Sequence, residues 1–268
     1  MAAASVFGRR YGLLAALSLL VIVGFALSPP VTVFSKTHAI GYAICHQIPG
    51  RTFHIDGVPL PLCARCTGIY LGFLAGLLGM LALHRQYAID LPPTWILATL
   101  VMFIGVMAFD GINSFLEFVP SIPQLYASQN WLRLVTGTLH GLAISVIFYP
   151  VVSISVWHPD LTQPAAIIET GREFAAFLAA GGVAVLAVLW QNPLLLYPLA
   201  ILSTLGVLII LTMINTIIVL VITRREALAR TWQDVLVPVT MALAISFLLI
   251  GGMDWLRAAI TRAANLPF

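Results

Sequence analysis

Residues 194–222 read LLLYPLAILSTLGVLIILTMINTIIVLVI and contain no charged side chain. A helix rises about 1.5 Å per residue, so about 20 apolar residues cross the hydrocarbon core of a bilayer. The rest of the chain has a similar character, because 60% of the 268 residues are hydrophobic and only 9% are charged. A soluble domain of this size needs more charge on its surface. The sequence therefore predicts an all-α integral membrane protein.

Apolar stretches divide the chain into about seven predicted transmembrane helices, at residues 13–34, 67–85, 94–110, 133–157, 174–190, 194–222 and 233–253. All six tryptophans lie at the ends of these stretches, as expected of rings held at headgroup depth. A polar segment at 159–173 contains two prolines and separates two predicted parts. The first is a four-helix membrane unit at 1–158 with an extramembrane Cys/His loop at 35–66. The second is a three-helix membrane extension at 174–268.

The orientation of the helices is predicted from basic residues, which concentrate in short cytoplasmic loops. With the N-terminus inside, seven basic residues face the cytoplasm and six face outward, and the dense groups Arg9-Arg10 and Arg224-Arg225 favour this arrangement. The Cys/His loop then lies on the outer face of the membrane. Arg9-Arg10 followed by an apolar core also fits a cleavable signal peptide, although no clean small-x-small cleavage site follows.

The Cys/His loop holds all three cysteines of the chain. Cys63 and Cys66 form a CxxC motif just before a predicted helix that Thr67 is able to cap, and the pair Cys45-His46 lies 18 residues before Cys63. Three thiolates and one imidazole supply the four ligands of a tetrahedral zinc ion. The sequence thus predicts a zinc site formed by Cys45, His46, Cys63 and Cys66, with His54 as an alternative fourth ligand.

Two other interpretations of the same cysteines stay open. A CxxC motif at a helix N-terminus favours a reactive thiolate, because the helix dipole and a neighbouring arginine stabilise negative charge. Cys63, Cys66 and Cys45 would then be the catalytic residues of a thiol–disulfide oxidoreductase that passes electrons to a quinone in the bilayer. Membrane enzymes of that kind use two cysteine pairs, whereas this chain has three cysteines. The third interpretation is one structural disulfide and a spare thiol.

A stripe of glycines follows the CxxC motif. Gly68, Gly72 and Gly76 recur every four residues, and small residues at this spacing let a second helix approach closely. We interpret them as packing residues that mount the CxxC motif rigidly.

A polar pocket is predicted on the same side of the membrane as the Cys/His loop. The third predicted helix ends FDGINS (109–114) and the fourth begins near NWLRLVTGTLHG (130–141). Ionisable residues at membrane depth usually face a partner, a cavity or a pathway. The simplest expectation is an ion pair between Asp110 and Arg133. A further alternative is a small-solute or ion transporter whose pathway is lined by the pocket residues Asp110, Asn113, Asn130, Arg133 and His140.

Three segments in this order, CHQIPGRTF (45–53), PLCARCTGIYLGFLAG (61–76) and NWLRLVTGTLHG (130–141), resemble an uncharacterised prokaryotic family of multi-pass membrane proteins with a CHQ…PLCARCTG signature. The resemblance covers about residues 35–150. It implies a multi-pass protein in the inner (plasma) membrane of a prokaryote, and no established activity comes with it. Its signature falls on Cys45, His46, Arg51, Cys63, Arg65, Cys66, Gly68, Asn130, Arg133 and Gly137.

Several classes of function are excluded by the sequence. It has no GxxxxGK[ST] or GxGxxG motif for nucleotides, no serine hydrolase elbow and no HExxH. A net charge of +3 without a basic tract argues against nucleic acid as a partner. The lipid bilayer is the expected partner, zinc the expected cofactor, and whether the protein is an enzyme is left open.

Overall fold

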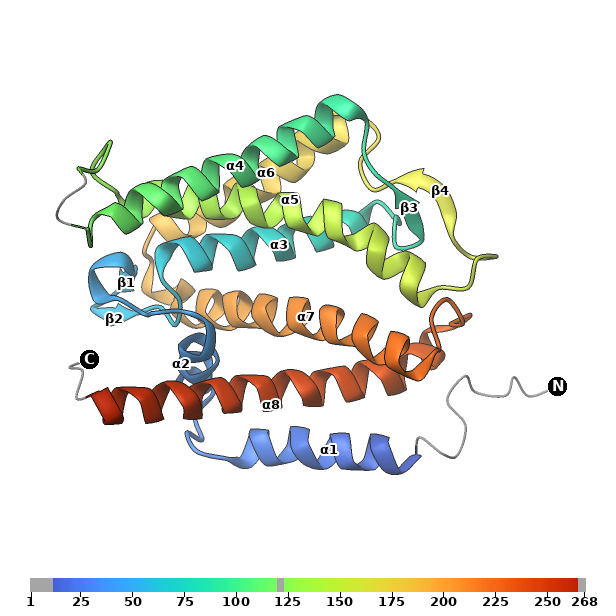
Figure 1. Ribbon diagram of the computed structural model, residues 1–268. Helices are drawn as coiled ribbons and strands as arrows, with labels where there is room; N and C mark the ends of the chain where they lie inside the picture. Colours follow the sequence, from blue (N-terminus) through green and yellow to red (C-terminus); the bar gives the residue numbers. More distant parts are fainter. Residues whose placement is uncertain (1–11, 120–122, 265–268) are drawn as a thin grey trace.

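The structure is a computed structural model that describes residues 12–119 and 123–264, so Arg9 and Arg10 lie outside the described residues. Long helices run side by side between two ends of the molecule (Figure 1). They are α3 (Ala64–Ala82), α4 (Thr94–Leu116), α5 (Asn130–Val156), α6 (Gly171–Leu189), α7 (Leu196–Thr223) and α8 (Trp232–Ala264).

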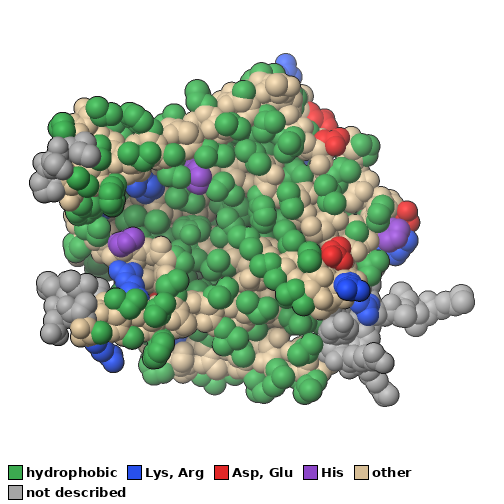
Figure 2. Space-filling model, viewed as in Figure 1, with side chains coloured by type: hydrophobic (Ala, Val, Ile, Leu, Met, Phe, Trp, Pro, Cys, Tyr) green, Lys and Arg blue, Asp and Glu red, His purple; other side chains and the backbone are tan. Residues whose placement is uncertain are grey.

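The predicted class, an all-α multi-pass membrane protein, is confirmed. Six helices of the described chain are long and apolar enough to cross a membrane. The first predicted span, 13–34, corresponds to α1 (Gly12–Leu27), an apolar helix of 16 residues that is shorter than the roughly 20 residues of a full span. Figure 2 shows a face covered mostly by hydrophobic side chains, with charged residues gathered toward the two ends.

The segment 35–66, predicted as a loop, contains more structure than expected. It overlaps helix α2 (Val33–Ile44), a short 3₁₀ turn η2 (Pro49–Arg51) and a hairpin of strands β1 (His54–Ile55) and β2 (Val58–Pro59). Thr32 caps α2 by accepting a hydrogen bond from the backbone N–H of Ser35 at 3.1 Å. With 12 residues, α2 is too short for a span, and its buried residues Ile40 and Ala43 pack in one cluster with residues of α7 and α8.

Helices α3 and α5 share the largest helix–helix contact in the molecule. A Cβ atom added at Gly68 or Gly72 would collide with the backbone carbonyl oxygens of Leu134 and Thr138 on α5. The relation is reciprocal, because a Cβ at Gly137 or Gly141 of α5 would collide with backbone oxygens of α3. Glycines on both helices therefore bring the two backbones into direct contact, as small residues do in membrane helix pairs.

Both parts predicted from the sequence contribute to one bundle. Helices α6 and α7 pack on α3. Helix α7 also packs on α8, the last helix of the chain, and α1 and α2 pack against α8 as well. The division at 159–173 stays a prediction; that segment contains β4 (Gln163–Ala166), which pairs in parallel with β3 (Ala88–Asp90).

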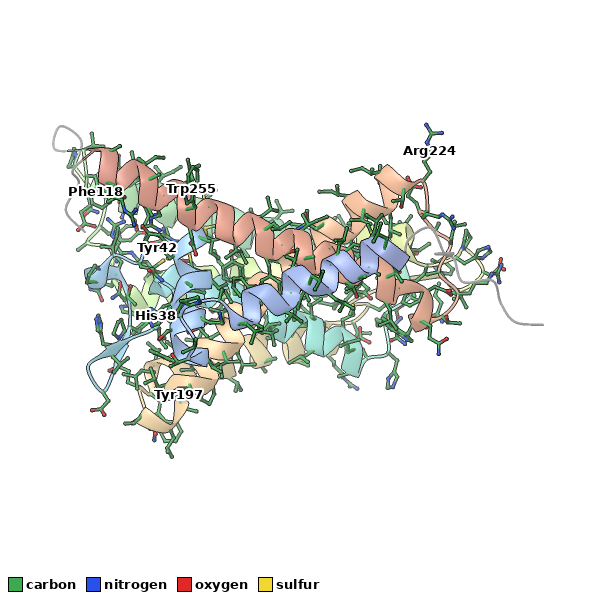
Figure 3. The ribbon with its side chains drawn as sticks, turned by 90° about the horizontal axis from the view of Figure 1, so that it is seen from below. His38, Tyr42, Phe118, Tyr197, Arg224 and Trp255 are labelled. Atoms are coloured by element: carbon green, nitrogen blue, oxygen red, sulfur yellow. The ribbon has the colours of Figure 1, made fainter. Side chains whose placement is uncertain are left out.

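The two ends of the bundle differ in content. One end carries α2, the β1–β2 hairpin, the segment after α4 and the C-terminal turns of α8, and we call it the cysteine end. The opposite end carries the β3–β4 pair and the turn between α7 and α8 (Figure 1). Phe118 and Arg224 mark these two ends in the view from below (Figure 3).

Candidate metal centre

The three cysteines come from two elements that meet at the cysteine end. Cys45 is the C-cap of α2, Cys63 is the N-cap of α3, and Cys66 lies in the first turn of α3. Their Sγ atoms all lie within 4.8 Å of one another, and all three thiols are free. The backbone N–H of Cys63 donates to Sγ of Cys45 at 3.2 Å, which joins the two elements directly.

Contacts around Cys45 fix the position of its sulfur. The Gln47 side chain donates to the carbonyl oxygens of His38 at 3.0 Å and Pro61 at 2.7 Å, so one amide joins the last part of α2 to the chain before α3. Gly41 permits this approach, because a Cβ there would collide with the Pro61 carbonyl. Cys45 itself is only 3% exposed.

The last helix holds the same segment from its other side. The Arg257 guanidinium donates to the carbonyl oxygens of Tyr42 and Cys45, both at 2.6 Å, and of His46 at 3.2 Å. It also lies over the Tyr42 ring, 4.0 Å from the ring centroid. Tyr42 lies in the last turn of α2, and Cys45 and His46 follow the end of that helix, so Arg257 serves as its C-terminal cap.

Negative charge in the thiol cluster is concentrated on one sulfur. Hydrogen bonds from the Cys45 and Cys66 thiols, aided by the nearby Arg65 charge, hold the pKa of Cys63 well below its usual range despite burial. The hydrogen bond to Cys63 and burial raise the pKa of Cys45. Cys63 is therefore the cysteine of this cluster whose environment most favours the thiolate, the form that binds metals.

The structure brings together three of the four predicted zinc ligands. Within the described residues, the compact group contains Cys45, Cys63 and Cys66 and no histidine. His46 is exposed beside the cluster and lines the same cavity, while His54 is exposed on the hairpin. The identity of the fourth ligand stays a prediction. Thr67, expected to cap α3, lies one turn inside it, and its hydroxyl donates to the Leu62 carbonyl at 3.1 Å.

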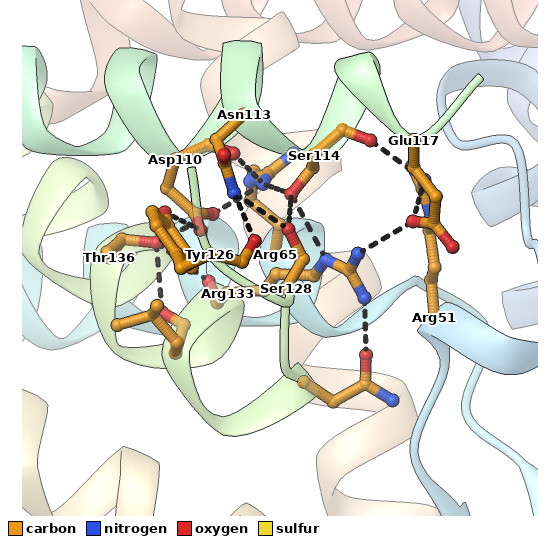
Figure 4. Close-up of polar contacts among 12 residues, drawn as sticks. Arg51, Arg65, Asp110, Asn113, Ser114, Glu117, Tyr126, Ser128, Arg133 and Thr136 are labelled. Carbon is orange, nitrogen blue, oxygen red and sulfur yellow. Dashed lines mark hydrogen bonds and ion pairs between the residues drawn. The ribbon is translucent and has the colours of Figure 1, made fainter. Parts of the chain in front are cut away.

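A buried polar network lies next to the thiols (Figure 4), and its central ion pair differs from the expected one. Arg65, between the two cysteines of the CxxC motif, forms an ion pair and hydrogen bond with Asp110, whereas Arg133 lies 3.6 Å from Glu117. Asp110 was expected to pair with Arg133. The Arg65 guanidinium, from the first turn of α3, reaches Asp110, while Arg133 is held by Ser114 and Asn130.

The other predicted pocket residues differ in their roles. Asn113 accepts from the backbone N–H of Leu125 at 2.8 Å and donates to the Tyr126 carbonyl at 2.9 Å, so it holds the segment after α4. The Asn130 side chain accepts a hydrogen bond from Arg133 at 3.0 Å and donates one to the Gly50 carbonyl at 3.2 Å. His140 lies outside this network, and its buried Nδ1 has no hydrogen-bond partner among the described residues.

Residues that the sequence did not single out complete the network. Ser114 accepts from Arg65 at 2.9 Å and from Arg133 at 3.4 Å, and Glu117 accepts from Arg51 at 2.6 Å. The Tyr126 hydroxyl donates to Asp110 at 2.8 Å, and burial together with this bond raises the pKa of Tyr126 to about 12. Ser114 and Glu117 follow Asp110 at helical spacings of four and seven. They were missed because the predicted helix ended at residue 110, whereas α4 continues to Leu116.

The fold and this site define a multi-pass helical membrane protein with a thiol cluster at one end of its bundle. The chain belongs to the family described as predicted membrane protein (DUF2085), whose model matches residues 45–147. That range begins at Cys45 and includes the polar network, and it agrees with the resemblance to an uncharacterised membrane protein family expected at 35–150. Helices α6, α7 and α8 lie beyond it.

Two curated archaeal proteins are similar to this chain. An uncharacterized protein of Methanothermobacter thermautotrophicus is 33% identical over 104 residues, which are 39% of this chain and 83% of that protein. An uncharacterized protein of Methanocaldococcus jannaschii is 34% identical over 112 residues, which are 42% of this chain. The match spans 64% of the length of the second protein. No solved structure matches the chain.

Proposed function

We propose that Cys45, Cys63 and Cys66 bind one zinc ion. The observation that carries this proposal is the convergence of three free sulfurs within 4.8 Å of one another. Sulfurs bound to one tetrahedral zinc at about 2.3 Å lie about 3.8 Å apart. A displacement of about 1 Å or less per sulfur therefore forms the site.

The fourth position completes the geometry. His46 lies next to Cys45 and lines the cavity that the thiols face, which supports it as the fourth ligand, and His54 on the hairpin is the alternative. The zinc would join the end of α2 to the start of α3. Its role in this proposal is structural, because it fastens the Cys/His segment to the rigid α3–α5 pair.

Elemental analysis tests the zinc proposal on detergent-purified full-length protein. We expect about one zinc per wild-type chain. Cys63→Ser and Cys66→Ser should each lose the zinc, because two thiolates and one histidine hold the ion far more weakly than a complete set of four ligands. His54→Ala and His46→Ala then distinguish the fourth ligand. Metal-free protein whose three thiols all react with an alkylating agent after denaturation would contradict the proposal.

A second candidate function is thiol–disulfide exchange, favoured by the lowered pKa of Cys63 and by the second thiol of Cys66 in the first turn of the same helix. In this reaction two thiols lose two electrons and two protons and form one disulfide, and a bilayer quinone takes up both to give a quinol. The same alkylation experiment distinguishes it, because metal-free protein with two thiols protected until a reductant is added indicates a disulfide. Solute transport through the polar network stays a prediction.

We further propose that the cysteine end faces outward from a prokaryotic plasma membrane. Basic residues at this end are largely used inside the fold: Arg51, Arg65 and Arg133 line a cavity, and Arg257 caps α2. Arg172, Arg224 and Arg230 at the opposite end are exposed, whereas Arg262 is the one exposed Lys or Arg at the cysteine end within the described residues. The exposed positive charge therefore concentrates on one side, and the positive-inside rule places that side in the cytoplasm.

Cysteine labelling of intact cells checks this orientation. We expect His54→Cys, on the exposed hairpin, to react with a membrane-impermeant maleimide above the background of the parent chain. Glu226→Cys, exposed in the turn between α7 and α8, serves as the matched variant and should react only after the cells are permeabilised. The reverse pattern would place the cysteine end in the cytoplasm.

A further inference from the structure

A cavity of about 160 Å³ opens between the thiol cluster and the polar network. Its polar lining consists of the three thiols, His46 and three arginines, namely Arg51, Arg65 and Arg133. No carboxylate lines it in the described part of the chain. Arg65 lies between the two groups, with its backbone in the CxxC motif and its guanidinium in the network (Figure 4).

The arginines are held by the fold with their side chains largely buried. The exposed fraction is 17% for the side chain of Arg51, 20% for Arg65 and 5% for Arg133. Their acidic partners, Asp110 in the last turns of α4 and Glu117 at its C-cap, do not line the cavity, and the Glu117 side chain is 52% exposed. Two carboxylates thus offset three guanidinium groups, and solvent substantially screens the charge of one carboxylate, Glu117.

Hydrogen-bond donors remain available on these arginines. A guanidinium has five N–H groups in a planar fork. Nε of Arg65 is buried and has no hydrogen-bond partner among the described residues. Arg133 donates from Nε to Ser114 and from Nη1 to Asn130, and its Nη2 lies 3.6 Å from Glu117, beyond hydrogen-bond distance. A buried donor without an acceptor destabilises a protein, and an incoming acceptor removes that cost.

Within the described residues, every charged side chain that lines the cavity is an arginine. The carboxylates that pair with them, Asp110 and Glu117, do not line the cavity, so an anion that enters it meets the guanidinium groups first.

From these contacts we propose that the cavity binds a small oxyanion through Arg51, Arg65 and Arg133, next to the thiol cluster. The planar forks of arginines match the paired oxygens of phosphate, sulfate and carboxylate groups. The cavity is smaller than the roughly 300–1,000 Å³ of sites for drug-sized ligands, so the group it encloses is a single anionic head. That head is either a free anion or the phosphate of a lipid, since the cavity lies at one end of the membrane helices.

The test uses the full chain in detergent and measures binding of radiolabelled inorganic phosphate by equilibrium dialysis, with sulfate and acetate as competitors. We expect saturable binding of one phosphate per chain. Arg51→Gln should weaken it about tenfold, because a charge-assisted hydrogen bond contributes about 1.5 kcal/mol or more. Arg85→Gln is the matched control, because Arg85 pairs with Glu169 at the opposite end of the bundle, and should bind like wild type.

A variant with the opposite effect keeps the test independent of folding. Glu117→Gln removes a competing carboxylate from an exposed position, so we expect it to bind phosphate several-fold more tightly. Cys66→Ser, which loses zinc under the proposal above, should still bind phosphate, so the two proposals fail separately.

Two further arms identify the source of the anion. If dihexanoyl phosphatidic acid displaces phosphate at lower concentration than phosphate itself, the occupant is a lipid headgroup; if it does not compete, the occupant is a free anion. Both outcomes support the site when Arg51→Gln and Glu117→Gln shift the affinity in opposite directions. Absence of saturable binding of phosphate, sulfate, acetate and the lipid, or equal affinity in both variants, would overturn it.

Discussion

Asp110→Ala is expected to destabilise the protein by about 3–5 kcal/mol, the usual cost of removing one partner from a buried ion pair. Asp110 is 1% exposed and accepts hydrogen bonds from Arg65 and from the Tyr126 hydroxyl. Its removal leaves the Arg65 guanidinium without its carboxylate in a largely buried position. The midpoint of unfolding in sodium dodecyl sulfate, followed by tryptophan fluorescence, measures the loss.

Glu169→Ala is the control for this prediction. Glu169 also accepts from an arginine, Arg85, at 2.6 and 2.7 Å, but it lies on the surface at the opposite end, where exposed pairs contribute little. The double variant Arg65→Met/Asp110→Leu should recover much of the lost stability, since apolar pairs often replace buried ion pairs without loss. Equal unfolding midpoints for Asp110→Ala and Glu169→Ala would show that the buried pair has no special weight.

Gly72→Ala is expected to destabilise the protein by about 1–3 kcal/mol or more, although it adds a single methyl group. The new Cβ would collide with the backbone carbonyl of Thr138, and a backbone atom within a helix cannot move aside. Helices α3 and α5 would have to separate, and each carries part of the site: Cys66 on α3 and Arg133 on α5. The change is measured as a lower melting temperature in detergent.

Gly105→Ala provides the comparison within the same protein. Gly105 lies in the middle of α4, and a Cβ there meets no atom within 4 Å. Alanine has a higher helix propensity than glycine, so this variant should melt at or above the wild-type temperature. If Gly72→Ala and Gly105→Ala melt alike, then close contact of α3 and α5 is not what stabilises the bundle.

Fold class and most span positions could be predicted from the sequence because a long apolar run has few alternatives in water or lipid. The misplaced boundaries have a common cause. The third predicted helix ends at Asp110 and the fourth begins at Arg133, yet α4 continues to Leu116 and α5 already begins at Asn130, because the polar side chains of these turns bond to one another and to nearby backbone groups. A hydropathy scale gives the free-energy cost of placing a polar side chain in the membrane, but it does not show which hydrogen-bond or ion-pair partner offsets that cost.

The gathering of the cysteines was also predictable, whereas their neighbours were not. A CxxC motif and a distant Cys-His pair indicate a shared site by chemistry alone. The sequence did not indicate that Arg65 pairs with Asp110 while Ser114 and Asn130 hold Arg133, because these partners come from three different helices. Helix α2 was missed because its 12 residues are too few to register as a span.

Arg257 is synthesised long after the segment that it caps. It is 212 residues beyond Cys45, whose carbonyl it binds, and it lies outside the segment that matches the family model. A ribosome adds about 5–20 residues per second, so about 10–40 s pass between the synthesis of Cys45 and that of its clamp. During that interval the end of α2 lacks its cap. Any ion or protein that reaches the cysteines in this period meets a looser site than the one that the finished chain presents.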